Sequence, residues 1–257
     1  VENGASCTIA AINVTMQEAS RFGILNTRED GTIYEFEEKP KQPKSTLASM
    51  GIYIFTAQKL YDYLEEDDSN PSSSKDFGKD VLPAMLAAGE KMVAYSFDGY
   101  WKDVGTISSL WEANMDLLGD DPAFDVSNSD WKIHSRNPLA PPEYVGEDAI
   151  IKNSMIALGC EIEGTVINSL LSSNVIVKKG AFVKDSVIMS GTVIEEDARV
   201  TYAIIDEDVT VSRGAVIGEE RTSKKGIAVL GRNIVVEEGA ILPGGNIVDK
   251  NVLKGGK

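Results

Sequence analysis

The sequence contains few of the side chains that carry metal or nucleophilic chemistry. Among its 257 residues there are one histidine and two cysteines, Cys7 and Cys160. Two thiols in separate segments are too few for a disulfide framework, and they lack the spacing of metal ligands. The cysteine content therefore favours a protein of the reducing cytoplasm over a secreted one.

Long hydrophobic runs and an excess of positive charge are also missing. No stretch approaches the roughly 20 apolar residues that a membrane span requires, and no charged-then-apolar leader opens the chain. Lys and Arg number 25 against 40 Asp and Glu, so the formal net charge is −15. Nucleic-acid binders depend on clustered cations, which argues against that class. An anionic ligand would have to be bound by local lysines together with a divalent cation.

The second half of the chain does contain a clear repeat. After a small residue and a spacer, an aliphatic residue recurs in steps of five or six, and equivalent positions return every seventeen residues. The recurring residues are Val177, Val183, Ile188, Ile194, Val200, Ile205, Val211 and Ile217. These steps fit neither strand alternation nor the i, i+3, i+4 pattern of a helix. They predict a three-sided coil of short strands, interrupted at residues 221–226 and resumed at 236–248.

The first half alternates predicted strands and helices. We expect strands at residues 7–14, 23–25, 32–36, 48–55 and 92–97, and helices at 57–64, 76–88 and 108–118. The apolar run at residues 7–14 predicts a strand that is buried on both faces. The alternation predicts an α/β fold with a parallel or mixed sheet over residues 1–119, a linker over 120–142 and the coil over 143–257.

Three polar clusters stand near predicted strand ends. Residues 35–40 place acids and a lysine before a proline, residues 47–55 begin a strand with Ser49 and Gly51, and residues 99–106 precede a helix. Each cluster alone has a structural explanation as a solvated edge, a bulge or a capped loop. Together they place a carboxylate, a lysine and a hydroxyl where α/β sheets bind ligands.

Four motifs in these regions resemble, in the same order, those of bacterial glucose-1-phosphate adenylyltransferases. They are Phe36-Glu-Glu-Lys39-Pro40, Ala48-Ser49-Met-Gly51-Ile-Tyr-Ile-Phe55, Asp76-Phe-Gly-Lys-Asp80 and Tyr100-Trp-Lys-Asp103-Val-Gly-Thr106. A hexapeptide-type coil follows them, and the resemblance covers essentially the whole chain. It implies a partial nucleotidyltransferase domain with a Rossmann-like mixed sheet, followed by a left-handed parallel β-helix.

The resemblance also implies an activity and residues that serve it. The family joins ATP and glucose 1-phosphate to form ADP-glucose and pyrophosphate, in glycogen biosynthesis. By resemblance, Glu38 binds sugar hydroxyls, Lys39 pairs with the phosphate of the sugar phosphate, and Gly23 and Ser49 line the same pocket. Asp103 corresponds to a carboxylate that holds the divalent cation, Mg²⁺. Lys39 and Asp103 are thus the expected catalytic residues of a cytoplasmic allosteric enzyme that has phosphorylated or nucleotide effectors.

The sequence departs from the family at one point. The glycine-rich nucleotide loop and the second metal-binding aspartate of the family have no counterpart here, and the first residue is Val1 rather than Met. We therefore expect a fragment that carries the sugar-phosphate side of the catalytic domain and the coil, and that is inactive alone. The family forms homotetramers, or heterotetramers with a regulatory paralogue, and the assembly of this fragment stays open.

Two other functions remain possible at this point. A non-catalytic regulatory subunit of the same enzyme would share the fold, although the presence of Lys39 and Asp103 favours the catalytic form. A hexapeptide coil also occurs in acyltransferases, which generally use a histidine base in or near the coil. The one histidine, His134, precedes the repeat and is more simply a linker residue, so acyl transfer is less favoured.

Overall fold

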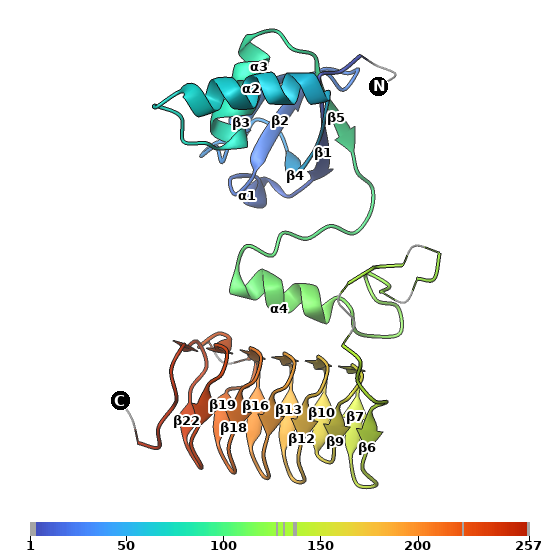
Figure 1. The fold of residues 1–257 in the computed structure, drawn as a ribbon, viewed down its shortest axis with the longest axis vertical. Helices are drawn as coiled ribbons and strands as arrows, with labels where there is room; N and C mark the ends of the chain where they lie inside the picture. Colours follow the sequence, from blue (N-terminus) through green and yellow to red (C-terminus); the bar gives the residue numbers. More distant parts are fainter. Residues whose placement is uncertain (1–3, 127, 131, 136–137, 223, 256–257) are drawn as a thin grey trace. The chain divides into compact units, whose positions relative to one another are not determined.

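The computed structural model describes residues 4–126, 128–130, 132–135, 138–222 and 224–255 (Figure 1). The chain divides into two compact units, Val1–Gly99 and Tyr100–Lys257. The second unit begins before residue 119, where the sequence predicts the end of the first domain, and it includes helix α4 (Ile107–Met115). Among the described residues, no helix is long and apolar enough to cross a membrane.

A mixed five-stranded sheet forms the centre of the first unit. Its order is β3-β2-β4-β1-β5. The strands are β1 (Cys7–Asn13), β2 (Gly23–Thr27), β3 (Ile33–Glu38), β4 (Leu47–Phe55) and β5 (Met92–Ser96). β1 is antiparallel to β4 and parallel to β5, so the prediction of a mixed sheet is confirmed. Gly51, with φ of +71°, lies where the register between β1 and β4 shifts, which supports its interpretation as a bulge residue.

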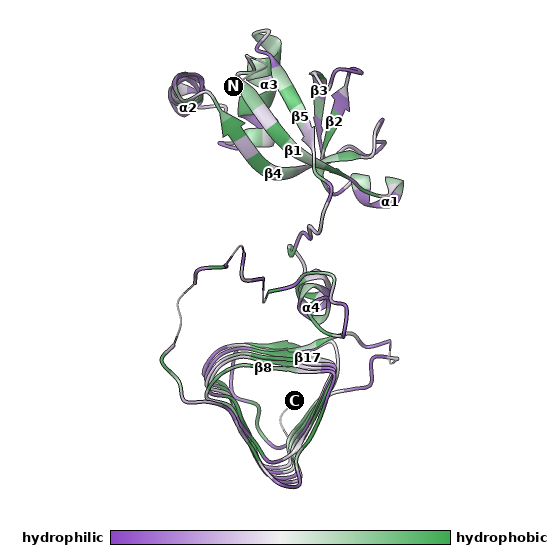
Figure 2. Ribbon diagram, turned by 90° about the vertical axis from the view of Figure 1, so that its right-hand side faces the viewer, coloured by the Kyte–Doolittle hydropathy of each residue, from purple (hydrophilic) through white to green (hydrophobic). Residues whose placement is uncertain are grey.

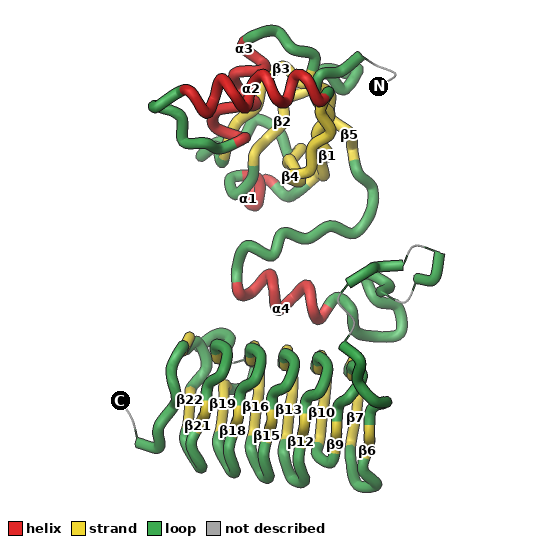
Figure 3. Tube along the Cα trace, in the orientation of Figure 1, coloured by secondary structure: helices red, strands yellow, loops and turns green. Residues whose placement is uncertain are grey.

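Helices surround this sheet unevenly. They are α1 (Met16–Ala19), α2 (Ala57–Ser69), the π-helical turn η1 (Phe77–Val81) and α3 (Leu82–Ala87), and Figure 3 shows the helices in red. None of the residues of α2 is buried. η1 and α3 pack on one sheet face, where Ile9 is fully buried beneath Leu82 and Met85. On the opposite face, Ile54 is 72% exposed. The prediction that the first strand is buried on both faces is therefore wrong, because helices cover only one face of β1 along most of its length.

The second unit contains three parallel six-stranded sheets that form the sides of a coil (Figure 2). The strands are β6 (Tyr144–Val145), β7 (Ile150–Lys152), β8 (Met155–Ile156), β9 (Glu161–Ile162), β10 (Thr165–Ile167), β11 (Leu170–Leu171), β12 (Ile176–Val177), β13 (Phe182–Lys184), β14 (Val187–Ile188), β15 (Val193–Ile194), β16 (Arg199–Thr201), β17 (Ala203–Ile205), β18 (Thr210–Val211), β19 (Val216–Gly218), β20 (Ala228–Leu230), β21 (Val235–Val236), β22 (Ile241–Leu242) and β23 (Ile247–Val248).

The aliphatic repeat forms the interior of this coil. Val177 pairs with Ile194, and Ile194 with Val211, in the seventeen-residue register that the sequence predicts. All eight recurring aliphatics are fully buried. Each contributes about 1.5–3 kcal/mol through burial. The parallel β-helix is therefore confirmed, whereas its left-handed sense stays a prediction.

One corner of the coil is built from a ladder of asparagine and aspartate. Asn153, Asn168 and Asp185 have φ values of 44°, 48° and 49°, in the left-handed region that Asn and Asp tolerate. The amide of Asn153 donates to Asn168 Oδ1 at 2.8 Å, and the amide of Asn168 donates to Asp185 Oδ1 at 2.6 Å. These side chains stabilise successive turns because each satisfies a polar group of its neighbour.

Helix α4 packs on the coil at this corner. Trp111 is 3% exposed, and its Nε1 donates to the carbonyl oxygen of Asp185 at 2.8 Å. The Tyr202 ring packs edge-on against the Trp111 ring, with the two ring centroids 5.0 Å apart. The Arg221 guanidinium lies 4.9 Å from the Trp111 ring centroid. Val187 and Ile204 complete the contact, which explains why α4 belongs to the second unit.

Candidate functional site

The paired ends of β2 and β3 place Glu38 beside two glycines. Gly23 and Glu38 are direct partners in the antiparallel register. A Cβ added to Gly23 would lie 3.1 Å from Glu38 Oε2, and one added to Gly78 of η1 would lie only 2.6 Å from the same oxygen. Any larger side chain at Gly78 would displace the Glu38 carboxylate. The absence of a Cβ at both glycines thus leaves room for this carboxylate.

Lys39 follows the strand in an unusual backbone conformation. Its φ is +46°, which is uncommon for a lysine, and its N–H donates to the Phe22 carbonyl at 3.0 Å. The Lys39 ammonium lies 3.4 Å from Glu38 Oε1, and the Lys39 side chain is 64% exposed against 20% for Glu38. A largely buried acid and a solvent-facing cation therefore lie side by side, and the cation is accessible to an anionic ligand.

Ser49 and Tyr53 extend this site onto β4. Ser49 is 8% exposed, and its Oγ accepts the Gly51 N–H at 3.2 Å. Burial raises the pKa of Tyr53, a hydrogen bond with Ser49 opposes that shift, and the charges of Glu38 and Asp76 add to it. Tyr53 therefore bonds to Ser49 and is close enough to Glu38 for its charge to act, whereas the grouping of Gly23, Glu38, Lys39 and Ser49 into one site stays a prediction.

Hydrogen bonds fix the start of η1, which carries Gly78. Asp76 Oδ1 accepts the Lys79 N–H at 3.0 Å. Asp80 Oδ2 accepts from the Ser74 hydroxyl at 2.5 Å and from the Asp76 N–H at 3.2 Å. The hydrogen bond from Ser74 is the main reason why the pKa of Asp80 is lowered. Single π-helical turns are frequent at functional sites, and this one places Gly78 next to the Glu38 carboxylate.

Sequence reasoning assigned no role to Gly78 or Tyr53. Both residues lie inside motifs that carry the family resemblance, at residues 76–80 and 48–55. Their place in those motifs was the one feature of the sequence that could have marked Gly78 and Tyr53 as candidate site residues. The position of Gly78 beside Glu38, and that of Tyr53 beside Ser49, became visible only in the folded structure.

Asp103 lies in the second unit, in the segment that precedes α4. Its Oδ1 accepts the Gly105 N–H at 3.2 Å. The Lys102 ammonium lies 2.8 Å from Asp116 Oδ2, and the Tyr100 hydroxyl donates to the same oxygen at 3.0 Å. These contacts fasten the segment to α4. Asp103 is thus held with α4 and the coil, whereas Glu38 and Lys39 belong to the first unit.

The remaining titratable candidates do not form a site. Burial raises the pKa of Cys7 to about 12, and burial is also the main cause that raises the pKa of Cys160, so both thiols stay protonated. His134 is exposed and precedes the coil. Across the described part of the chain, no group of three or more His, Cys, Asp or Glu side chains is arranged to hold a metal ion.

Comparison with known proteins adds an independent observation. Residues 1–119 match the nucleotidyl transferase family, and residues 142–236 match the GlmU-like C-terminal hexapeptide family. The chain is 53% identical over 243 residues to a glucose-1-phosphate adenylyltransferase of Clostridium perfringens (strain SM101 / Type A), covering 93% of this chain and 62% of that protein.

Two further relatives carry the same name. The protein from Acetivibrio thermocellus is 43% identical over 281 residues, covering 100% of this chain and 66% of the relative. The protein from Bacillus anthracis is 50% identical over 221 residues, covering 86% of this chain and 59% of the relative. The chain thus spans between 59% and 66% of these three curated relatives. The chain thus combines a nucleotidyl transferase segment with a GlmU-like hexapeptide segment, and it is similar to glucose-1-phosphate adenylyltransferases over 86–100% of its own length.

Proposed function

We propose that the whole protein, of which this chain spans a part, is a glucose-1-phosphate adenylyltransferase of glycogen biosynthesis. It would form ADP-glucose and pyrophosphate from ATP and glucose 1-phosphate. The observation that carries the proposal is the Glu38 carboxylate, which lies beside Gly23 and Gly78 and is paired with the exposed Lys39 ammonium. A carboxylate accepts hydrogen bonds from sugar hydroxyls, and a lysine binds phosphate as a point charge.

The chemistry assigned to these residues is positioning and charge neutralisation. A phosphate oxygen of glucose 1-phosphate attacks the α-phosphorus of ATP, the bond to the β-phosphate bridging oxygen breaks, and pyrophosphate leaves. Lys39 would neutralise the attacking phosphate, while Glu38 would orient the sugar ring. Ser49 and Gly23 would border the sugar. Fixed geometry of this kind lowers the barrier because the entropy of alignment is lost on binding rather than in the transition state.

Nucleotidyl transferases generally use a divalent metal ion, and we propose Mg²⁺ with Asp103 as one ligand. Mg²⁺ typically takes one or two carboxylates together with substrate phosphate oxygens, so a single protein carboxylate fits that donor set. The ion would neutralise charge on the phosphates. The hydrogen bond from Gly105 and the anchoring of the neighbouring Lys102 to Asp116 would hold the carboxylate in place.

Several wider features remain part of this proposal. They are the division into residues 1–119, 120–142 and 143–257, a cytoplasmic location, phosphorylated or nucleotide effectors, and a homotetramer or a heterotetramer with a regulatory paralogue. A regulatory subunit is the second candidate function. The presence of Lys39 beside Glu38 favours the catalytic form, because a subunit without catalysis has no need of this pair.

The test is Lys39→Ala in the full-length protein, with Lys41→Ala as a matched control that removes an exposed lysine two residues away. Loss of one charge-assisted contact costs about 1.5–3 kcal/mol, which corresponds to roughly a 10- to 150-fold rise in the KM for glucose 1-phosphate. The KM for ATP should change little, and Lys41→Ala should leave both values unchanged. An unaltered KM for glucose 1-phosphate in Lys39→Ala would remove Lys39 from the site and support the regulatory subunit.

A further inference from the structure

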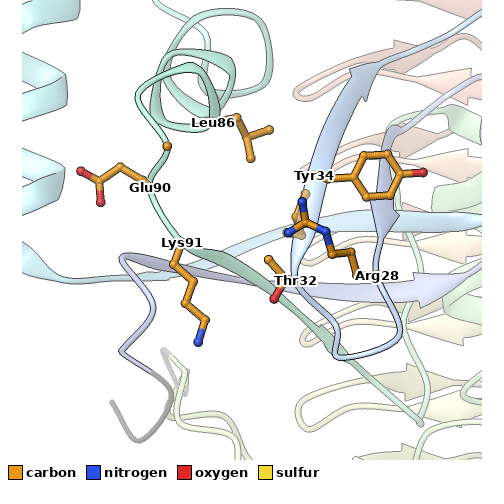
Figure 4. A pocket seen from close by; sticks show the side chains of 8 residues that line it. Arg28, Thr32, Tyr34, Leu86, Glu90 and Lys91 are labelled. Carbon is orange, nitrogen blue, oxygen red and sulfur yellow. The ribbon is translucent and has the colours of Figure 1, made fainter.

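A second polar region of the first unit lies at the other end of β3. It is a groove of about 470 Å³, whose side chains include Arg28, Thr32, Tyr34, Leu86, Glu90 and Lys91 (Figure 4). We call it the cationic groove. Ile33 and Glu38 are five residues apart along β3, so the groove lies about 17 Å from the proposed sugar-phosphate site. The two regions are therefore separate.

Hydrogen bonds donated by backbone N–H groups hold both walls of the cationic groove in place. On one side, the Thr32 N–H donates to Asp30 Oδ1 at 2.9 Å, and the Ala94 N–H donates to the Gly31 carbonyl at 2.9 Å. On the other side, the Glu90 N–H donates to the Met85 carbonyl at 3.0 Å. A groove with walls fixed in this way is preformed, so binding loses little conformational entropy.

The charge in the cationic groove is positive although the chain as a whole is acidic. Arg28 and Lys91 approach it from different segments, and Figure 4 shows the Glu90 carboxylate turned away from both. That carboxylate already accepts hydrogen bonds from Lys59 and Ser6. Within the described residues, the Arg28 guanidinium forms no ion pair, which leaves its donors available to a ligand.

The carboxylate of Asp30, two residues after Arg28, is also engaged. Hydrogen bonds from Thr32 are the main cause that lowers the pKa of Asp30, and the charge of Arg28 adds less. Asp30 is therefore committed to the hairpin turn. A local pair of cations in a chain of net charge −15 marks a place where an anion is selectively favoured.

We propose that the cationic groove binds a small phosphomonoester. A guanidinium donates two parallel hydrogen bonds to a phosphate, and the Lys91 ammonium adds a second positive charge. Tyr34, which is 54% exposed, and Leu86 supply an aromatic and an aliphatic surface for the carbon skeleton of the ligand. The proposal does not depend on the adenylyltransferase activity.

The test uses the 257-residue chain, with inorganic phosphate and phenyl phosphate as probes and amide chemical shifts as the readout. We expect saturable shifts at the amides of Thr32, Gly89 and Lys91. Arg28→Ala and Lys91→Ala should each weaken phosphate binding about tenfold, since each removes one charge-assisted contact. Lys152→Ala is the matched control, because it removes an exposed lysine of the coil and should leave the affinity unchanged.

Tyr34→Ala separates the apolar wall from the charges. Phenyl phosphate should bind more tightly than inorganic phosphate, and Tyr34→Ala should remove that difference without altering the affinity for inorganic phosphate. Folding of each variant is checked by the dispersion of the remaining amide resonances, and Arg28→Lys provides a milder substitution if Arg28→Ala unfolds.

Three outcomes would overturn the proposal. They are the absence of shifts at the cationic groove, shifts that persist unchanged in Arg28→Ala and Lys91→Ala, and phosphate binding that only Lys39→Ala removes. The last result would place the anion at the proposed sugar-phosphate site, and so would support the proposed function while contradicting the groove. Phosphate binding at the cationic groove that persists in Lys39→Ala supports the present proposal, whether or not the proposed function is correct.

Discussion

Trp111 is the residue on which the attachment of α4 to the coil most depends. Its indole N–H donates to the carbonyl of Asp185, and its ring contacts Tyr202 and Arg221. Truncation to alanine removes the hydrogen bond and both ring contacts and leaves a buried space. Substitution by phenylalanine keeps an aromatic ring and part of the apolar contact, but removes the donor and some of the buried volume.

The expected losses in the free energy of unfolding follow from these contacts. Trp111→Ala should cost about 3–5 kcal/mol, the usual range for truncating a buried aromatic. Trp111→Phe should lower the free energy of unfolding by about 1–3 kcal/mol, because the buried carbonyl oxygen of Asp185 loses its hydrogen-bond donor. For a unit of this size, 1 kcal/mol corresponds to about 2–4 °C in Tm when the whole unit unfolds together.

The assay is amide hydrogen exchange, because α4 can detach without unfolding the coil. Amides of α4 should lose protection in Trp111→Ala, while those of the coil strands such as β15 should keep it. Ser108→Ala, which alters an exposed α4 side chain, is the control and should leave both unchanged. Protection of α4 that stays within about 0.5 kcal/mol of the unsubstituted chain would refute the role of Trp111.

Three further predictions concern the first unit and the chain as a whole. Gly78→Ala should raise the KM for glucose 1-phosphate in the full-length protein more than Gly231→Ala, a control in the coil where an added Cβ would meet its nearest atom at 3.4 Å, because only the former displaces Glu38. The pKa of Glu90 is held below its usual 4.5, chiefly by the hydrogen bond from Lys59 and then by that from Ser6. A carboxyl group whose pKa is lower in the folded than in the unfolded state stabilises the fold at pH values above the unfolded-state pKa. That contribution is lost as the pH falls through the folded-state pKa. Glu90→Gln should therefore lower the unfolding midpoint of the first unit at pH 7 and flatten its decline on acidification, and an unaltered acid profile would contradict this. Finally, the 257-residue chain should form no ADP-glucose from ATP and glucose 1-phosphate, since its sequence contains no glycine-rich nucleotide loop; detection of radiolabelled ADP-glucose above a no-enzyme control would disprove this.

Much of the architecture follows from the sequence because it depends on local periodicity. An aliphatic residue every five or six positions leaves each turn of the coil one side chain to bury, and all eight recurring residues are buried accordingly. The hairpin of β2 and β3 follows in the same way from the Asp-Gly turn and its alternating neighbours. The motif around Glu38 and Lys39 likewise drew attention to a pair that the structure places side by side, while their common site with Ser49 stays a prediction.

Only the tertiary structure decided the features that depend on distant partners. The sequence predicted a first strand buried on both faces, but apolar composition does not reveal which face the helices cover. Gly78 lies against Glu38, and Trp111 bonds to Asp185 across 74 residues. Contacts of this kind leave no periodic trace in the sequence, because each depends on where a remote segment is placed by the sheet or the coil.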